Sequence, residues 1–182
     1  MSSRYRELTT KVDAFFARVQ TRHATDMKCG SGCDSCCRTR LTITGVEAEA
    51  LRAHVATMDP AAKLRLKEVA RRPFDPRDMR CAALEDDGRC LVYGGRPIVC
   101  RSHGVPIRFY GEADGKRFPI IDSCPLNFVT GPHHADQDCI LDQETLSATL
   151  IAIDNQDADA RGRDRGDRFD LAALLIELTA DE

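Results

Sequence analysis

The chain has 182 residues, a length that suits one domain built around a single hydrophobic core. Its 26 basic and 29 acidic residues give a formal net charge of -3, and this balance does not suggest the concentrated basic face that binding to nucleic acid requires, so no nucleic-acid partner is expected. The first residues lack the apolar stretch of a signal peptide, and the longest apolar runs are too short to cross a bilayer. We therefore expect a cytoplasmic protein with no membrane partner.

Three helices are predicted in the N-terminal part of the chain. The first, within residues 1–25, has apolar residues at spacings of three and four. A T-x-x-E capping box opens the second helix, and an aspartate followed by proline opens the third. A short extended piece, Leu41–Ile43, precedes the second helix. The predicted helices run from Arg4 to about Thr21, from Thr44 with Glu47 to about Thr57, and from Asp59 with Pro60 to Arg71.

The middle of the chain has short apolar runs separated by turn residues, a pattern typical of β-hairpins. One hairpin is predicted from Cys81 to Tyr93, around an acidic turn that ends at Gly88. A second has Val105–Tyr110 and Arg117–Ile121 as its arms, with a glycine-bounded turn between them. The cysteine-rich metal-binding core at 29–124 is thus expected to contain loops and hairpins beside these helices.

The C-terminal part, residues 142–182, is expected to supply helices. Asp142 caps the first of them, a mobile charged loop follows at about 155–168, and Phe169–Leu178 forms a short helix that docks back on the domain. Together the elements predict an α+β fold, with residues 1–182 forming one small domain. Several short helices then surround a metal-binding centre that contains loops and hairpins.

Nine cysteines are the most informative feature of the sequence. The cytosol keeps thiols reduced, so a cysteine-rich pattern there indicates metal binding or catalysis more often than disulfides. The first cluster lies in a glycine- and serine-containing loop that cannot form a core strand or helix. Thiolates repel one another and resist burial, so such a cluster favours a bound cation, around which glycines let the backbone wrap closely. The cluster consists of Cys29, Cys33, Cys36 and Cys37.

Four further cysteines form a second set. A hairpin brings two of them together, and prolines stiffen the chain beside the other two. These are Cys81, Cys90, Cys100 and Cys124. Four ligands satisfy zinc or a cubane cluster, so the eight cysteines furnish either two sites or one site with supporting thiols. Adjacent side chains of an extended chain point to opposite sides, so Cys36 and Cys37 are not expected to share one tetrahedral ion.

Other candidate ligands have weaker signals. Cys139 stands apart beside an apolar residue and is interpreted as structural, with metal binding as the less favoured alternative. Imidazole ligands are conceivable at His103, His133 and His134, although a surface or hydrogen-bonding role is the preferred interpretation of each. For Arg96 and Arg101, compensation of thiolate charge and ordinary ion pairing are equally favoured.

The order of these motifs resembles the YkgJ-like cysteine cluster family, also called the CxxCxxCC family. The matching elements are C-x3-C-x2-C-C, the helix opened by Thr44 and Glu47, C-x8-C, Tyr93 and R-P-x-x-C-R, and they span about Cys29 to Cys124. The spacing of three residues between Cys29 and Cys33 departs from the family name. The resemblance implies a zinc- or iron-chelating domain. It implies that the seven cysteines from Cys29 to Cys100 are candidate ligands, and Cys124 matches the family pattern less closely.

The leading hypothesis is a protein that binds a transition metal, as zinc or an iron–sulfur cluster, for folding, redox chemistry or electron transfer. The spacing slightly favours iron, because structural zinc ribbons use pairs of C-x2-C and only Cys33 and Cys36 fit that spacing. A less favoured alternative is an enzyme resembling radical S-adenosylmethionine enzymes, and a third is a metal buffer or metal-shaped interaction module. A protein partner or substrate is compatible with all three, and no catalytic residue is identified.

Overall fold

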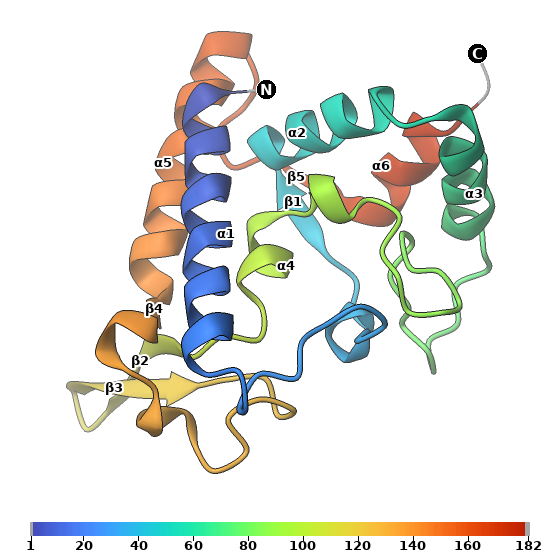
Figure 1. Ribbon diagram of the computed structural model, residues 1–182. Helices are drawn as coiled ribbons and strands as arrows, with labels where there is room; N and C mark the ends of the chain where they lie inside the picture. The colour runs from blue at the N-terminus through green and yellow to red at the C-terminus, as the bar shows by residue number, and fades with distance from the viewer. Residues whose placement is uncertain (1, 181–182) are drawn as a thin grey trace. The chain divides into compact units, whose positions relative to one another are not determined.

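The computed structural model describes residues 2–180 and confirms the α+β fold class. Within this domain the chain forms two compact units. Unit 1 consists of the described residues of Met1–Arg6, Gly30–Pro97 and Ile153–Glu182, and unit 2 consists of Glu7–Cys29 and Ile98–Ala152. Helices α1 (Ser3–Arg22) and α5 (Gln143–Arg161) contribute residues to both units (Figure 1).

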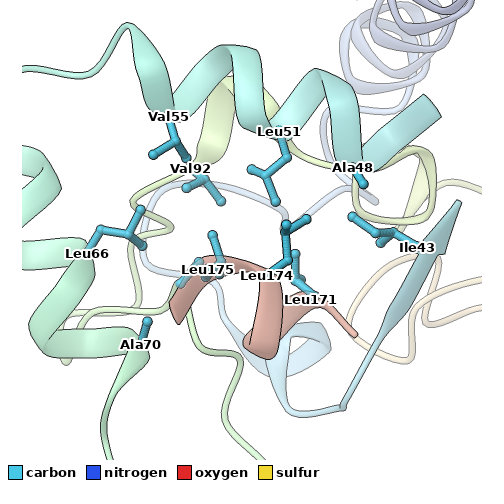
Figure 2. Packing of buried hydrophobic residues seen from close by; sticks show 11 residues of the cluster. Ile43, Ala48, Leu51, Val55, Leu66, Ala70, Val92, Leu171, Leu174 and Leu175 are labelled. Atoms are coloured by element: carbon cyan, nitrogen blue, oxygen red, sulfur yellow. The ribbon is translucent and has the colours of Figure 1, made fainter. Parts of the chain in front are cut away.

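Unit 1 is built around a hydrophobic cluster between helices and a two-stranded sheet. Strands β1 and β5 pair antiparallel, with Ile43 opposite Phe169. Figure 2 shows Leu51 of α2 and Leu174 and Leu175 of α6 pointing toward one another, and all three side chains are buried. The elements are η1 (Ser35–Cys37), β1 (Thr42–Thr44), α2 (Gly45–Ala56), α3 (Pro60–Ala70), η2 (Tyr93–Gly95), β5 (Arg168–Asp170) and α6 (Leu171–Leu178).

The helices of unit 1 begin where their capping residues place them. The Glu47 carboxylate accepts hydrogen bonds from the backbone N–H and the hydroxyl of Thr44, both at 2.9 Å, which completes the capping box at the start of α2. Asp59 accepts a hydrogen bond from the backbone N–H of Ala62 at 2.9 Å and caps α3. The predicted second and third helices are therefore confirmed, as is the first helix, α1.

Unit 2 contains a small mixed sheet and several short helical turns. Strand β2 pairs antiparallel with β3 and parallel with β4. The turn between β2 and β3 is Asp114–Gly115, where both φ angles are positive, at 53 and 69°. This is the backbone of a tight two-residue hairpin turn, so the second predicted hairpin is confirmed with longer strands and a shorter turn. The elements are α4 (Ile98–Ser102), β2 (Ile107–Ala113), β3 (Lys116–Asp122), η3 (Pro132–His134), η4 (Gln137–Cys139) and β4 (Leu141–Asp142).

Two segments differ from the sequence prediction. The hairpin expected at Cys81–Tyr93 is reduced to a single bridge between Leu84 and Cys90, because the chain enters the turn η2 directly afterwards. Helix α5 continues to Arg161, into the segment expected to be a mobile loop at 155–168. The helix persists there because Ala158 is fully buried and Arg161 forms an ion pair with Asp157 one turn earlier, at 3.1 Å.

The short C-terminal helix is confirmed as α6, although it begins at Leu171 because Phe169 lies in β5. Asp170 caps this helix by accepting a hydrogen bond from the backbone N–H of Ala173 at 2.9 Å. Among residues 2–180, no helix combines the length and the apolar character that a membrane crossing needs.

The N-terminus of α5 yields a testable prediction about stability and pH. The Asp142 carboxylate accepts a hydrogen bond from the Thr145 backbone N–H at 2.8 Å and another from Arg108, and these bonds lower the pKa of Asp142. A lowered pKa in the folded state stabilises the protein above the ordinary pKa, and this contribution is lost as the pH falls through the folded value. We expect Asp142→Ala to cost about 1 kcal/mol at neutral pH in urea unfolding.

The effect of Asp142→Ala should shrink below about pH 4, where the carboxylate of the unfolded chain becomes protonated. Asp142→Asn is the matched control, because asparagine also caps helices but carries no charge. It should retain most of the stability at neutral pH and show no such pH dependence. Equal pH dependence in the parent and Asp142→Asn would contradict this account of the cap.

Candidate metal centre

Two adjacent thiols of unit 1 lie on the one-turn helix η1. Cys36 and Cys37 are joined by a hydrogen bond between their side chains. They were expected to diverge, as on an extended chain, but this segment is a 3-10 turn, in which successive side chains are rotated by about 120° rather than 180°. The helical turn therefore brings the two sulfur atoms together on one side of the chain.

The second cysteine set of unit 1 lies beside this turn. The backbone N–H of Cys81 donates a hydrogen bond to the Cys37 carbonyl at 2.8 Å. The glycine of the acidic turn, Gly88, lies so close to the Gly32 backbone that an added Cβ would be 2.6 Å from the Gly32 carbonyl oxygen. Glycine is required at Gly88 for this approach and for its φ of 79°. The backbone thus holds the first cysteine loop against the segment that carries the second set.

Mutual electrostatic effects contribute to the raised pKa values of three thiols of unit 1. The pKa of Cys36 is raised by its hydrogen bond with Cys37, by burial and by the charge of Cys37. Burial raises the pKa of Cys81, and the charge of Cys36 raises it further. Burial raises the pKa of Cys90 to about 11, with smaller contributions from Cys81 and Cys36. The charge of Cys81 is thus felt at Cys90, as expected for two cysteines on either side of one turn.

This donor set fits a soft metal ion. Thiolates bind zinc and the iron of iron–sulfur clusters, and a cation offsets both the burial and the mutual repulsion that oppose ionisation of these thiols. All nine cysteines lie in the described part of the chain and are thiols. Among the described residues, the group of three donor atoms within 4.8 Å of one another lies elsewhere, at His23, Asp136 and Cys139. The unit 1 thiols are therefore gathered more loosely than a bound ion would hold them.

Arg96 is the cation associated with these thiols. Its charge lowers the pKa of both Cys36 and Cys90, in opposition to burial. The guanidinium group is held over the Tyr93 ring, 3.4 Å from the ring centre, and Nε donates a hydrogen bond to the Tyr93 carbonyl at 2.9 Å. The charge of Arg96 thus acts on two thiols, while its guanidinium group contacts Tyr93.

The structure places three of the predicted ligands, Cys29, Cys100 and Cys124, in unit 2. The Sγ atom of Cys29 accepts a hydrogen bond from Nδ2 of Asn127 at 3.1 Å. A Cβ added at Gly104 would lie 2.6 Å from this sulfur atom, so the backbone at Gly104 packs directly against the thiol. Cys100 is half-buried on α4, and Cys124 is buried.

Asn127 is a site residue that sequence analysis missed. Its side chain accepts a hydrogen bond from the Lys28 backbone N–H at 2.8 Å and donates to the Gly104 carbonyl at 2.7 Å and to Cys29. Its own backbone N–H donates to the Cys124 carbonyl at 2.8 Å. This 2% exposed asparagine therefore connects the chain around Cys29 with the chain around Cys124. An asparagine three residues after a cysteine carries no recognisable signal in the sequence.

The other candidate residues from the sequence are one cysteine, one arginine and three histidines. Cys33 is half-buried in unit 1, and its backbone N–H donates a hydrogen bond to the Gly30 carbonyl at 3.1 Å. Arg101 forms an ion pair with Asp13 at 2.6 Å, the ordinary alternative considered for it. Burial lowers the pKa of His103, which favours the neutral imidazole. The rings of His133 and His134 contact each other, with their centres 4.2 Å apart.

Comparison with known proteins identifies the cysteine-rich segment. Residues 28–116 match the family model of the CxxCxxCC family, which is described as a "putative zinc- or iron-chelating domain". This segment belongs to the CxxCxxCC family. The match confirms the predicted family, metal binding, and zinc or iron as the metal. The family segment includes all the predicted ligands except Cys124. No curated protein and no solved structure matches the chain.

Proposed function

We propose that this CxxCxxCC-family protein holds an iron–sulfur cluster on thiolates of unit 1 and serves in redox or electron-transfer chemistry. The observation that carries the proposal is the backbone contact between the two cysteine segments of unit 1, from the Cys81 N–H to the Cys37 carbonyl, together with the mutual electrostatic effects of their thiols. The proposed ligands of this thiolate centre are Cys36, Cys37, Cys81 and Cys90. The other predicted ligands, Cys29, Cys33, Cys100 and Cys124, are proposed as supporting thiols or as ligands of a further site.

The cysteine spacing favours iron over zinc. Structural zinc ribbons use pairs of C-x2-C, and only Cys33 and Cys36 fit that spacing here. Hydrogen bonds and nearby positive charge adjust the potential of iron–sulfur clusters, and Arg96 supplies that charge here.

The exposure of Cys36 is compatible with electron transfer to another protein. A partner that exchanges electrons must approach the cluster, and an exposed ligand gives it a short path. We propose that this exchange takes place in a reducing compartment such as the cytoplasm, where thiols persist.

A metal-dependent modification enzyme is the second candidate, because a cavity of about 460 Å³ opens beside Cys81. Its volume lies within the range of small-molecule sites. Apolar residues of α3 and α6 line one part of it, and Arg40, Arg72 and Arg80 line another. Each of these arginines already has an acidic partner, so the cavity combines apolar surface with compensated charge.

Anaerobic purification with metal and acid-labile sulfide analysis tests the proposal. We expect iron with equimolar sulfide and a broad visible absorption. In the double variant Cys36→Ser/Cys81→Ser, bound iron should fall at least about tenfold, because the replaced thiolates are the main source of affinity. If the metal analysis finds only zinc, and this zinc does not exchange, the protein holds a structural zinc ion and not a cluster. Variable amounts of several ions would indicate a metal buffer instead.

Ser35→Ala is the matched control for the double variant. It lies on the same turn as Cys36 and leaves every thiol in place, so its iron content should equal that of the parent. Equal iron in the parent and the double variant would contradict the ligand assignment. Cleavage of S-adenosylmethionine by the reduced, reconstituted protein would support the second candidate.

A further inference from the structure

Unit 2 contains a group of metal-ligating side chains outside the family segment. His23 follows α1, Asp136 precedes the turn η4, and Cys139 ends it. One donor atom from each of the three side chains lies within 4.8 Å of the other two. All three residues belong to unit 2 and lie outside residues 28–116, so they are separate from the proposed thiolate centre of unit 1.

The backbone explains how Asp136 and Cys139 come together. The Cys139 backbone N–H donates a hydrogen bond to the Asp136 carbonyl at 2.8 Å, across the 3-10 turn η4. A 3-10 helix has three residues per turn, so the side chains at positions i and i+3 lie one above the other. The turn thus aligns a carboxylate and a thiol on the same side.

His23 reaches this pair from the end of α1. Its backbone N–H donates a hydrogen bond to the Val19 carbonyl at 2.8 Å, and its ring packs against Phe128 with the ring centres 5.3 Å apart. Nε2 lies 3.6 Å from an Asp136 carboxylate oxygen and accepts a hydrogen bond from the Asp136 backbone N–H at 3.4 Å. An accepting Nε2 is unprotonated, which is the state of the imidazole that binds a metal, and an ion would replace this hydrogen bond at the same lone pair.

The second ring nitrogen of His23 faces another carboxylate. Nδ1 lies 4.0 Å from an Asp26 oxygen. In metal sites, a ligating histidine commonly directs its other nitrogen to a carboxylate or carbonyl, which selects the tautomer and orients the ring. At 4.0 Å the two groups are not hydrogen-bonded, so Asp26 takes that supporting role only when its carboxylate moves closer to Nδ1.

The nearest cation does not compete strongly for Asp136. Arg22 binds both carboxylate oxygens of Asp138, at 2.7 and 2.8 Å, and is 3.8 Å from the nearest Asp136 oxygen. The Asp136 side chain is 58% exposed and the His23 side chain 14%, while Cys139 is fully buried. An ion therefore has access from the solvent side, past Asp136, to a buried thiol.

We propose that His23, Asp136 and Cys139 form a second metal site, for a divalent late transition ion such as zinc. One imidazole nitrogen, one carboxylate oxygen and one thiolate form a mixed donor set that suits zinc or cobalt and does not suit magnesium or calcium, which take oxygen ligands. Three protein ligands leave the fourth tetrahedral position to water or an exogenous ligand. The buried Cys139 then has a ligand role beyond the structural role that its sequence context indicated.

Cobalt and zinc titrations of the full-length apo protein test this site. We expect His23→Gln and Asp136→Asn each to bind one equivalent less than the parent. Asp136→Asn is nearly isosteric at an exposed position, so its far-ultraviolet circular dichroism should match that of the parent. The matched controls Asp138→Asn and His133→Gln remove a carboxylate and an imidazole outside the group and should retain the parent stoichiometry. Parent stoichiometry in both site variants would overturn the proposal.

A second background separates this site from the proposed thiolate centre. In Cys36→Ser/Cys81→Ser, zinc should still raise the unfolding temperature, and the added change His23→Gln should abolish that increase. Metal loss in the double variant reports on the thiolate centre, whereas the response to His23→Gln reports on the second site. A zinc-dependent increase of unchanged size after His23→Gln would contradict the site even if the thiolate centre is correct.

Discussion

Removal of the metal is expected to release the first cysteine loop, residues 30–39, from the rest of unit 1. The backbone of this loop has few hydrogen bonds of its own, among them Cys33 N–H to the Gly30 carbonyl and Cys37 N–H to the Asp34 carbonyl. Structural zinc in small sites contributes about 10–16 kcal/mol, which is comparable to the entire stability of a domain, about 5–15 kcal/mol. The metal is therefore expected to be the main source of order in this loop.

Hydrogen exchange of the metal-loaded and chelator-treated protein measures this effect. Amides of residues 30–39 should exchange at least about tenfold faster without metal, the change that corresponds to about 1.4 kcal/mol of lost protection. Residues 81–92 should respond less, because Ala83 and Val92 are buried in the hydrophobic cluster of unit 1. Helices α2 and α6 serve as internal controls, since neither helix carries a cysteine. Equal exchange of residues 30–39 in both states would contradict metal-dependent order.

Replacement of Asn127 is expected to have the second large effect. Asn127→Leu keeps a similar volume but leaves the Lys28 backbone N–H and the Gly104 carbonyl without their side-chain partner. Each buried group that loses its hydrogen bond costs about 1–3 kcal/mol, so we expect a total loss of about 3 kcal/mol. Urea unfolding of the metal-free protein measures this loss without a contribution from metal affinity.

Leu126→Ala is the matched control for Asn127→Leu. The Leu126 side chain is 44% exposed and adjacent in the chain, so its truncation should change stability by about 0.5 kcal/mol or less. Asn127→Asp separates the hydrogen bond donated to the Cys29 sulfur from the hydrogen bond accepted from the Lys28 N–H. It keeps the acceptor for the Lys28 N–H but replaces the donor to the Cys29 sulfur with a negatively charged oxygen. A loss below about 1 kcal/mol for Asn127→Leu would show that other contacts hold these segments.

The elements with local signals were predicted well. The start of α2 follows from Thr44 and Glu47, three residues apart, and the start of α3 follows from Asp59 and Pro60. The hairpin β2–β3 follows from apolar runs around a glycine turn. In each case the hydrogen bonds that define the boundary join residues close in the chain, so neither tertiary contacts nor a metal is needed to specify them.

The elements without local signals were missed. Strand β5 pairs with β1 across more than a hundred residues, and α5 extends to Arg161 through a segment whose charges indicated a loop. The charges there form specific pairs, Asp157 with Arg161 and Asp154 with Arg163. Composition alone does not distinguish paired charges from solvated ones. The extension of α5 therefore depends on the packing of unit 1.

By itself, the sequence determined the chemistry of this protein: a thiol-rich segment of the CxxCxxCC family that chelates zinc or iron, on helices whose caps are encoded locally. Only the tertiary structure decided which donors are neighbours. It placed Asn127 on the Cys29 sulfur and brought His23 to Asp136 and Cys139. The physical reason is that the type of a ligand is a property of one side chain, whereas a coordination site requires side chains distant in the chain to converge through packing.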